Sequence, residues 1–183
     1  MLLIKGPGMN AVEKRIYVWD PFIRVFHWTL VLCIFLNYFI TEEGDTVHEV
    51  IGYIAAGFVV ARIIWGFIGG PNAQFRNWFA SPVTVFKYLR HYKNRKAYVT
   101  HNPIAGWMMV FLLACVIGLG VTGYMMGTDT YFGEEWVEEL HHNIGNVMMG
   151  GVAIHVLGVL LASYHEKQNL VAGMIHGYKN QKD

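Results

Sequence analysis

The sequence is poor in charged residues and in cysteine. Only 15% of its 183 residues are charged, whereas 54% are hydrophobic. That charged share is low for a soluble domain and argues against a water-soluble globular protein. The two cysteines, Cys33 and Cys115, lie within apolar stretches, and no Cys-x-x-Cys-His motif for covalent haem attachment occurs. We therefore expect both cysteines to be small buried hydrophobic residues.

The first twenty residues lack the continuous apolar run of a cleavable secretion signal. They contain five charged residues, namely Lys5, Glu13, Lys14, Arg15 and Asp20. We expect the first apolar stretch to direct membrane insertion itself. Residues 1–17 are predicted to form a flexible arm, residues 18–179 the single domain, and residues 180–183 a C-terminal tail.

What the sequence does contain is four long apolar stretches. A helix needs roughly 20 apolar residues to cross a hydrocarbon core of about 30 Å. The sequence therefore predicts an all-α membrane protein, a bundle of four transmembrane helices. The predicted spans are Phe22–Ile40, His48–Gly69, Pro103–Gly127 and His141–Tyr164.

The charges are distributed unequally between the links that join these spans. The links after the first and third spans carry only acidic residues in or beside them: Glu42, Glu43, Asp45, Glu49, Asp129, Glu134, Glu135, Glu138 and Glu139. All 14 Lys and Arg residues lie elsewhere. By the positive-inside bias, both termini and the loop of residues 70–100 are predicted to be cytoplasmic. Within that loop, Ser81-Pro82 predicts a short helix, capped by Ser81, that lies against the inner leaflet.

Four histidines lie at matched depths in the predicted spans. His155 follows His141 by fourteen residues, which places it about 21 Å further along a helix and about 40° around it. The alternating direction of the spans brings His27 level with His155 at the inner side, and His48 level with His141 at the outer side. His142 is about 140° from His155 around the helix, so His141 is preferred, although His142 remains an alternative.

Two separated histidine pairs within a membrane favour haem as the ligand. Taken singly, each histidine could be a structural residue near a helix end, but ionisable residues inside a bilayer are costly and usually functional. Two histidines can fill both axial positions of a haem iron, which suits electron transfer better than oxygen binding. Zinc instead favours a tetrahedral cluster of close ligands. The pairs therefore predict two haems, stacked with their irons roughly 20 Å apart.

Four further residues are predicted to serve the cofactors. Arg62 lies fourteen residues after His48, on nearly the same helix face but at the inner depth. No Asp or Glu is expected at that depth in a helix, so a haem propionate is its predicted partner; the alternative is an arginine that extends to the cytoplasmic interface. Gly52 and Gly145 each follow an outer histidine by four residues and would leave room for the macrocycle. His101, before Pro103, either belongs to the turn that starts the third span or lies near a quinone or propionate.

These residues form motifs that are similar to those of a known family. Asp20-Pro21-x-x-Arg24-x-x-His27-Trp28 resembles the start of the prokaryotic cytochrome b561 family, which includes the b-type cytochrome subunits of nickel–iron hydrogenases. The similarity extends from Tyr17 to Lys179. Its other parts are His48-Glu49-x-x-Gly52, Arg62-x-x-Trp65-Gly66-x-x-Gly69, His101-Asn102-Pro103, Thr122-Gly123, His155-Val156 and Glu166-x-x-Asn169-Leu170-Val171-x-x-Met174.

The resemblance implies a protein of the bacterial inner membrane with two non-covalent, bis-histidine b haems. Its haem ligands correspond to His27, His48, His141 and His155, and it implies electron transfer between the quinone pool and a periplasmic-side partner such as a c-type cytochrome or a hydrogenase. A nucleic-acid partner is not expected, and a homodimer is left open. Two other functions compete with this one: a quinone-linked oxidoreductase such as a superoxide oxidase, and a histidine-based metal-ion transporter.

Overall fold

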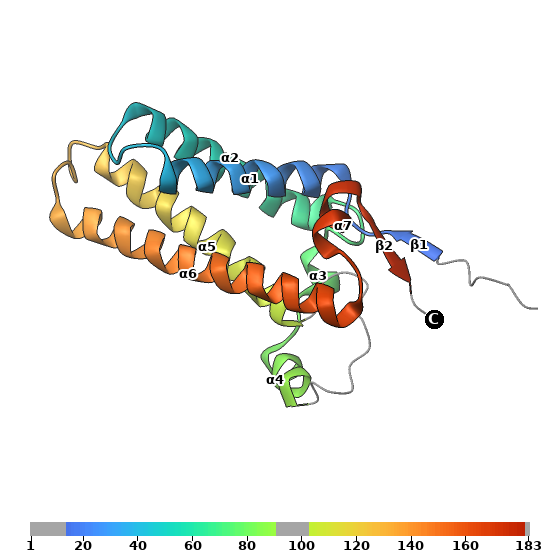
Figure 1. The fold of residues 1–183 in the computed structure, drawn as a ribbon. Helices are drawn as coiled ribbons and strands as arrows, with labels where there is room; N and C mark the ends of the chain where they lie inside the picture. The colour runs from blue at the N-terminus through green and yellow to red at the C-terminus, as the bar shows by residue number, and fades with distance from the viewer. Residues whose placement is uncertain (1–13, 91–102, 182–183) are drawn as a thin grey trace, which may run out of the picture.

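The computed structural model describes residues 14–90 and 103–181, and most of them belong to four long helices that run side by side (Figure 1). Three short helices and a two-stranded sheet complete this part of the chain. In chain order the elements are β1 (Lys14–Tyr17), α1 (Pro21–Phe39), α2 (Thr46–Ile68), α3 (Phe75–Trp78), α4 (Pro82–Arg90), α5 (Pro103–Met126), α6 (Glu135–Glu166), α7 (Leu170–His176) and β2 (Tyr178–Gln181).

The four long helices are each long and apolar enough to span a membrane, which confirms the predicted bundle. The boundaries of α1, α2 and α5 lie within two residues of those predicted. Helix α6 differs, because it has 32 residues and begins at Glu135 rather than at His141. Glu135 and Glu138 lie in its first turn, where negative charge interacts favourably with the helix dipole. At 1.5 Å per residue α6 is about 48 Å long, so it extends beyond a hydrocarbon core of about 30 Å.

The start of α1 is fixed by the Asp20-Pro21 pair. Asp20 is the N-cap residue, and its Oδ1 accepts a hydrogen bond of 2.9 Å from the backbone N–H of Ile23. Pro21 occupies the first turn, where its missing N–H is not needed. The other carboxylate oxygen of Asp20 accepts a hydrogen bond of 3.2 Å from Trp65 Nε1, so the same side chain also connects α1 to α2.

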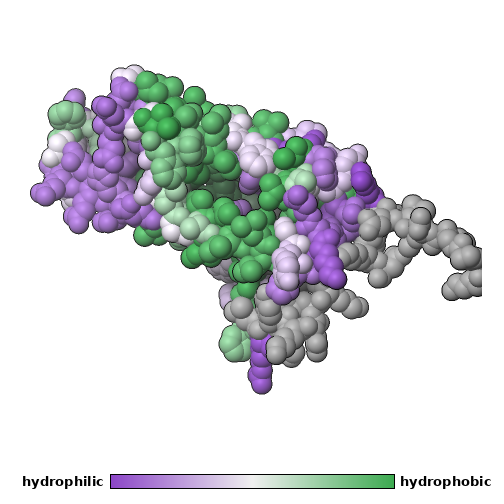
Figure 2. Space-filling model, viewed as in Figure 1, coloured by the Kyte–Doolittle hydropathy of each residue, from purple (hydrophilic) through white to green (hydrophobic). Residues whose placement is uncertain are grey.

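The long helices pack in the order α1, α2, α5, α6. Side chains of all four form one apolar core: Phe26, Cys33, Ala55, Val59, Leu113, Cys115, Val116 and Met148. Both cysteines are buried and free, as predicted. Among the described residues α1 and α6 make few direct contacts, and the apolar surface is hollowed between them (Figure 2).

The two ends of the described chain meet beside the bundle. Strands β1 and β2 pair antiparallel, with Lys14 opposite Gln181 and Tyr17 opposite Tyr178, and α7 lies next to them (Figure 1). Gly177 O accepts hydrogen bonds from the N–H groups of Val18 and Trp19 at 2.9 and 3.2 Å. We call β1, α7 and β2 the terminal clamp, because they connect the start of α1 to the end of α6. The sequence did not predict it: Lys14–Tyr17 was expected in the flexible arm, and residues 180 and 181 in the tail.

The surface has an apolar band between two polar ends (Figure 2). One end carries the α1–α2 and α5–α6 links with their acidic residues, and the other carries the terminal clamp (Figure 1). Ser81 caps the start of α4 as predicted, since its Oγ accepts a hydrogen bond of 3.3 Å from the Thr84 N–H. Its Val83 and Phe86 are 62% and 66% exposed, which suits a helix at a membrane surface.

Candidate functional site

His48 and His141 come together at the acidic end of the bundle. His48 lies in the first turn of α2, and His141 lies in the second turn of α6. Their ring centres are 6.3 Å apart and their planes form an angle of 58°. Two imidazoles bound to opposite sides of one metal ion, each through a bond of about 2 Å, have ring centres about 6 Å apart. We call His48 and His141 the outer pair, after the side of the membrane predicted for them. The distance between their ring centres fits a single iron between the two rings.

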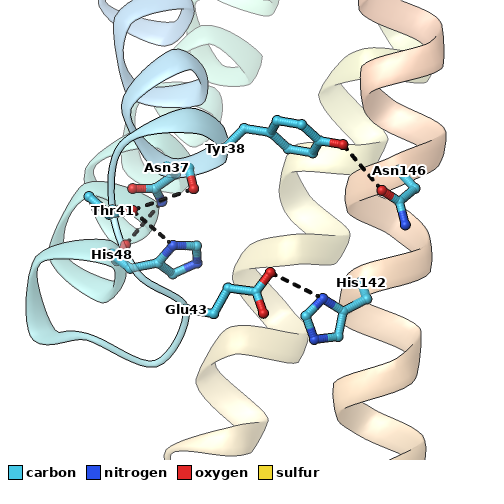
Figure 3. A network of polar contacts seen from close by, with 7 residues as sticks. All are labelled: Asn37, Tyr38, Thr41, Glu43, His48, His142 and Asn146. Atoms are coloured by element: carbon cyan, nitrogen blue, oxygen red, sulfur yellow. Dashed lines mark hydrogen bonds and ion pairs between the residues drawn. The ribbon is translucent and has the colours of Figure 1, made fainter.

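In each outer histidine the Nδ1 atom contacts a threonine hydroxyl. His141 Nδ1 lies 2.8 Å from Thr122 Oγ1, and His48 Nδ1 lies 3.2 Å from Thr41 Oγ1. Figure 3 shows the Thr41 contact beside Asn37, whose Nδ2 donates a hydrogen bond of 3.0 Å to the backbone oxygen of His48. With Nδ1 engaged on each ring, Nε2 is the nitrogen left to bind a metal.

The second pair, His27 of α1 and His155 of α6, lies toward the end that carries the terminal clamp. The two histidines are close enough to interact electrostatically, although their helices make few direct contacts. The Nδ1 atom of His27 is buried and has no hydrogen-bond partner in the described part of the chain. A buried polar atom without a partner is costly, so this inner pair also fits a site that is completed by a ligand.

Arg62 is buried at the same end of the molecule. The residue is 2% exposed, so its side chain is enclosed by protein and does not reach solvent. Its Nη2 donates a hydrogen bond of 3.1 Å to Ala73 O, and its guanidinium carbon lies 4.9 Å from the centre of the Phe75 ring. Its Nε and Nη1 are buried without a partner among the described residues.

One acidic residue lies closer to Arg62 than the sequence predicted. Asp20, just before α1, is near enough to interact electrostatically with Arg62. Its two oxygens already accept hydrogen bonds from Ile23 N and Trp65 Nε1. Two nitrogens of Arg62, Nε and Nη1, therefore remain available to donate to an anionic group such as a carboxylate.

Comparison with known proteins identifies the family. Residues 18–177 match the prokaryotic cytochrome b561 family. The chain belongs to this family. The matched range agrees closely with the extent of the resemblance predicted from Tyr17 to Lys179.

Several relatives of this b561 protein are similar over nearly their whole length. It is 26% identical to the "probable Ni/Fe-hydrogenase B-type cytochrome subunit" of Azotobacter vinelandii, over 97% of this chain and 95% of the relative. It is 28% identical to the protein of the same description from Rhodobacter capsulatus, over 96% and 86% of the two chains. The "probable Ni/Fe-hydrogenase 1 B-type cytochrome subunit" of Escherichia coli K12 is 26% identical, over 91% of both chains. The b561 protein is thus a b-type cytochrome of electron transport, with haem b as its cofactor.

The tandem histidines of the b561 protein differ in their surroundings. His141 is partly buried and faces His48, whereas the side chain of His142 is 51% exposed. His142 Nδ1 lies 3.6 Å from Glu43 Oε1 (Figure 3). This geometry is that of an interfacial histidine among acidic residues. His101 lies outside the described residues.

The two glycines expected near the outer haem have no tight protein contact. A Cβ atom at Gly52 would lie 3.5 Å from Asn37 Nδ2, and one at Gly145 would lie 4.0 Å from Leu119 Cδ2. Both distances are ordinary van der Waals contacts. Packing among the described residues therefore does not require glycine at either position.

Sequence reasoning missed the two threonines that contact the outer histidines. The sequence indicated Thr122 only as part of the Thr122-Gly123 motif of the family, and it gave no indication of a role for Thr41. The depth of Thr122 was a usable signal, because a hydroxyl near the outer end of its helix is level with His141. Thr41 lies in the link before α2, and the path of such a link cannot be calculated from helix periodicity.

Proposed function

We propose that this b561 protein holds two b haems, one between His48 and His141 and one between His27 and His155, and carries electrons across the membrane. The observation that supports this most strongly is the outer pair, with ring centres 6.3 Å apart and each Nδ1 already bound to a hydroxyl. A bound haem would supply a one-electron iron couple, and a pair of histidine ligands at each site would favour electron transfer over the binding of an external ligand. Helix α6 contributes one histidine to each pair, so it would connect the two sites.

At the outer site, Gly52 and Gly145 would leave space for the flat macrocycle, since no tight contact in the described chain explains them. At the inner site, Arg62 would bind a haem propionate through its free N–H groups. A positive charge beside the inner haem stabilises its reduced form, whereas the acidic links disfavour added electrons at the outer haem. We therefore expect the inner haem to have the higher potential, which favours inward electron flow.

The proposed partners follow from the two ends of the bundle. The quinone pool would exchange electrons with one haem, with His101 a candidate contact for quinone or propionate. A periplasmic-side redox protein, either a c-type cytochrome or a hydrogenase, would meet the acidic end. The described relatives favour a hydrogenase. The protein would reside in the bacterial inner membrane with both termini in the cytoplasm; whether it forms a homodimer is not assigned.

A quinone-linked oxidoreductase, such as a superoxide oxidase, is the second candidate. The observation in its favour is the exposed contact between His142 and Glu43 beside the outer pair (Figure 3), which could pass protons to a substrate there. A metal-ion transporter is disfavoured, because within residues 14–90 and 103–181 no group of three or more His, Cys, Asp or Glu residues could hold a metal ion.

Reduction by a quinol tests the proposed function. Detergent-purified protein is mixed anaerobically with a reduced short-chain quinol, and the visible spectrum is followed. We expect a reduced b-type spectrum to develop, with full reduction on adding dithionite. Reduction by dithionite but not by the quinol would contradict the quinone link while leaving haem binding intact.

A further inference from the structure

The outer histidines share a feature that the ligand assignment alone does not explain, namely a threonine hydroxyl on each Nδ1. We propose that Thr122 and Thr41 are positioning residues that fix the ring orientation and the protonated nitrogen of His141 and His48, and thereby lower the potential of the outer haem. This inference rests on the proposed function, because it takes His48 and His141 as ligands of one iron.

The direction of the Thr122 hydrogen bond follows from its other contacts. Thr122 Oγ1 lies 2.9 Å from Gly118 O and 3.2 Å from Leu119 O. Carbonyl oxygens can only accept, so the hydroxyl proton of Thr122 is donated to the backbone of its own helix. Oγ1 must then accept from His141 Nδ1–H at 2.8 Å. The proton of His141 is thereby fixed on Nδ1, and the Nε2 lone pair is free for iron.

Thr41 makes the same arrangement around His48. Its Oγ1 lies 3.4 Å from Asn37 O, to which it donates, and 3.2 Å from His48 Nδ1, from which it accepts. The corresponding Thr122 contacts are shorter, at 2.9 Å to Gly118 O and 2.8 Å to His141 Nδ1, and Thr122 is only 4% exposed. Thr122 is therefore the stronger of the two anchors.

A second contact on a ligating imidazole has two effects. It fixes the rotation of the ring, and it makes the ring nitrogen that binds the metal more basic. A more basic ligand stabilises oxidised iron and lowers its potential. His27 of the inner pair lacks this feature, since its Nδ1 has no hydrogen-bond partner in the described part of the chain. The threonines and the acidic links would both lower the potential of the outer haem, and Arg62 would raise that of the inner haem. All three therefore increase the difference between the two potentials.

The test compares Thr122→Val with Thr122→Ser. Valine keeps the shape of threonine without the hydroxyl, and serine keeps the hydroxyl. Thr29→Val is the matched control, because Thr29 lies in α1 two residues after His27, at the inner level. Each purified protein is analysed for haem per chain, for the two midpoint potentials by optical redox titration, and for the electron paramagnetic resonance spectrum. The g values of that spectrum depend on the angle between the two imidazole planes, which is 58° in the structure.

For Thr122→Val we expect a rise in the outer potential and changed g values of one haem, with the inner potential unchanged. Thr122→Ser should restore both wild-type signals, and Thr29→Val should leave the outer signals unaltered. Wild-type outer signals in Thr122→Val would overturn the proposal, as would equal shifts in Thr122→Val and Thr122→Ser. If Thr122→Val does not fold, Thr41→Val is judged by the same criteria. Absence of two haems from the wild-type protein would instead refute the proposed function itself.

Discussion

At the scale of single residues, neighbouring histidines on one helix have different surroundings. The His141 ring faces His48, with Thr122 behind it, whereas His142 turns toward Glu43 in the α1–α2 link. Successive residues of a helix point about 100° apart, so only one of the two histidines can face His48. The ligand at this level is therefore expected to be His141.

Alanine at each of the two positions tests this assignment. His141→Ala should remove an axial ligand and reduce the haem content from two per chain to one. His142→Ala should retain both haems, because it loses only an exposed contact with Glu43. Haem extracted from purified protein and divided by chain concentration gives the answer. Loss of haem in His142→Ala but not in His141→Ala would reverse the assignment.

Arg62 is the residue expected to set the potential of the inner haem. Arg62→Gln removes a buried positive charge, which should lower the inner midpoint potential because a nearby cation favours the reduced state. Arg76→Gln is the control, since Arg76 is an exposed arginine near the same end of the molecule. Redox titration measures both variants. An unchanged inner potential in Arg62→Gln would mean that Arg62 does not face a propionate.

At the scale of elements, the terminal clamp joins the two helices that carry the inner histidines. Helices α1 and α6 make few direct contacts among the described residues, but the clamp connects their ends. Lys179 Nζ of β2 forms an ion pair of 2.8 Å with Glu166 Oε2 at the end of α6. Arg24 Nη1 of α1 donates a hydrogen bond of 2.7 Å to Ile175 O in α7. The clamp should therefore hold His27 and His155 at their separation.

Two glycine substitutions test the clamp. Gly177 has a φ of +90°, and an added Cβ would lie 2.8 Å from Tyr17 Cε2 and 2.9 Å from Trp19 O. Gly133 has a φ of +75° but open space around it. Each alanine variant incurs about 1–2 kcal/mol of backbone strain, and only Gly177→Ala adds a clash. Gly177→Ala should lower the Tm in detergent more than Gly133→Ala and should weaken retention of the inner haem. Equal effects would show that the contact with β1 is unimportant.

Whether these elements can be predicted from sequence depends on how far apart in the chain the interacting residues lie. The long helices follow from continuous apolar stretches, and the level of each histidine follows from a constant rise per residue. Strands β1 and β2 could not be predicted, because Lys14–Tyr17 and Tyr178–Gln181 are short, polar and at opposite ends of the chain. The early start of α6 was missed because Glu135, Glu138 and Glu139 interrupt the apolar pattern before His141. The buried environment of Arg62 depends on Ala73 in the loop after α2 and on Phe75 in α3, and helix periodicity does not predict where either lies.

At the scale of the whole molecule, the acidic links occupy one end of the bundle and the terminal clamp the other (Figure 1). The positive-inside bias predicts that the acidic end faces the periplasm. An acidic surface there would attract a basic partner, and salt would weaken that attraction. The orientation therefore determines which haem meets the partner protein.

Single introduced cysteines test this orientation. The native Cys33 and Cys115 are only 7% and 9% exposed, so they should not react in intact cells. A membrane-impermeant thiol reagent should label Glu134→Cys in intact cells, and should label Arg76→Cys only after lysis. The opposite pattern would place the acidic end in the cytoplasm.

The proposed electron transfer depends on two bis-histidine haems within this bundle. Its most direct test is haem quantification by pyridine extraction from detergent-purified protein, together with oxidised and dithionite-reduced visible spectra. We expect two haems per chain and a sharp, low-spin reduced b-type spectrum. One haem per chain would contradict the paired sites, and the absence of any haem band would refute the proposed function.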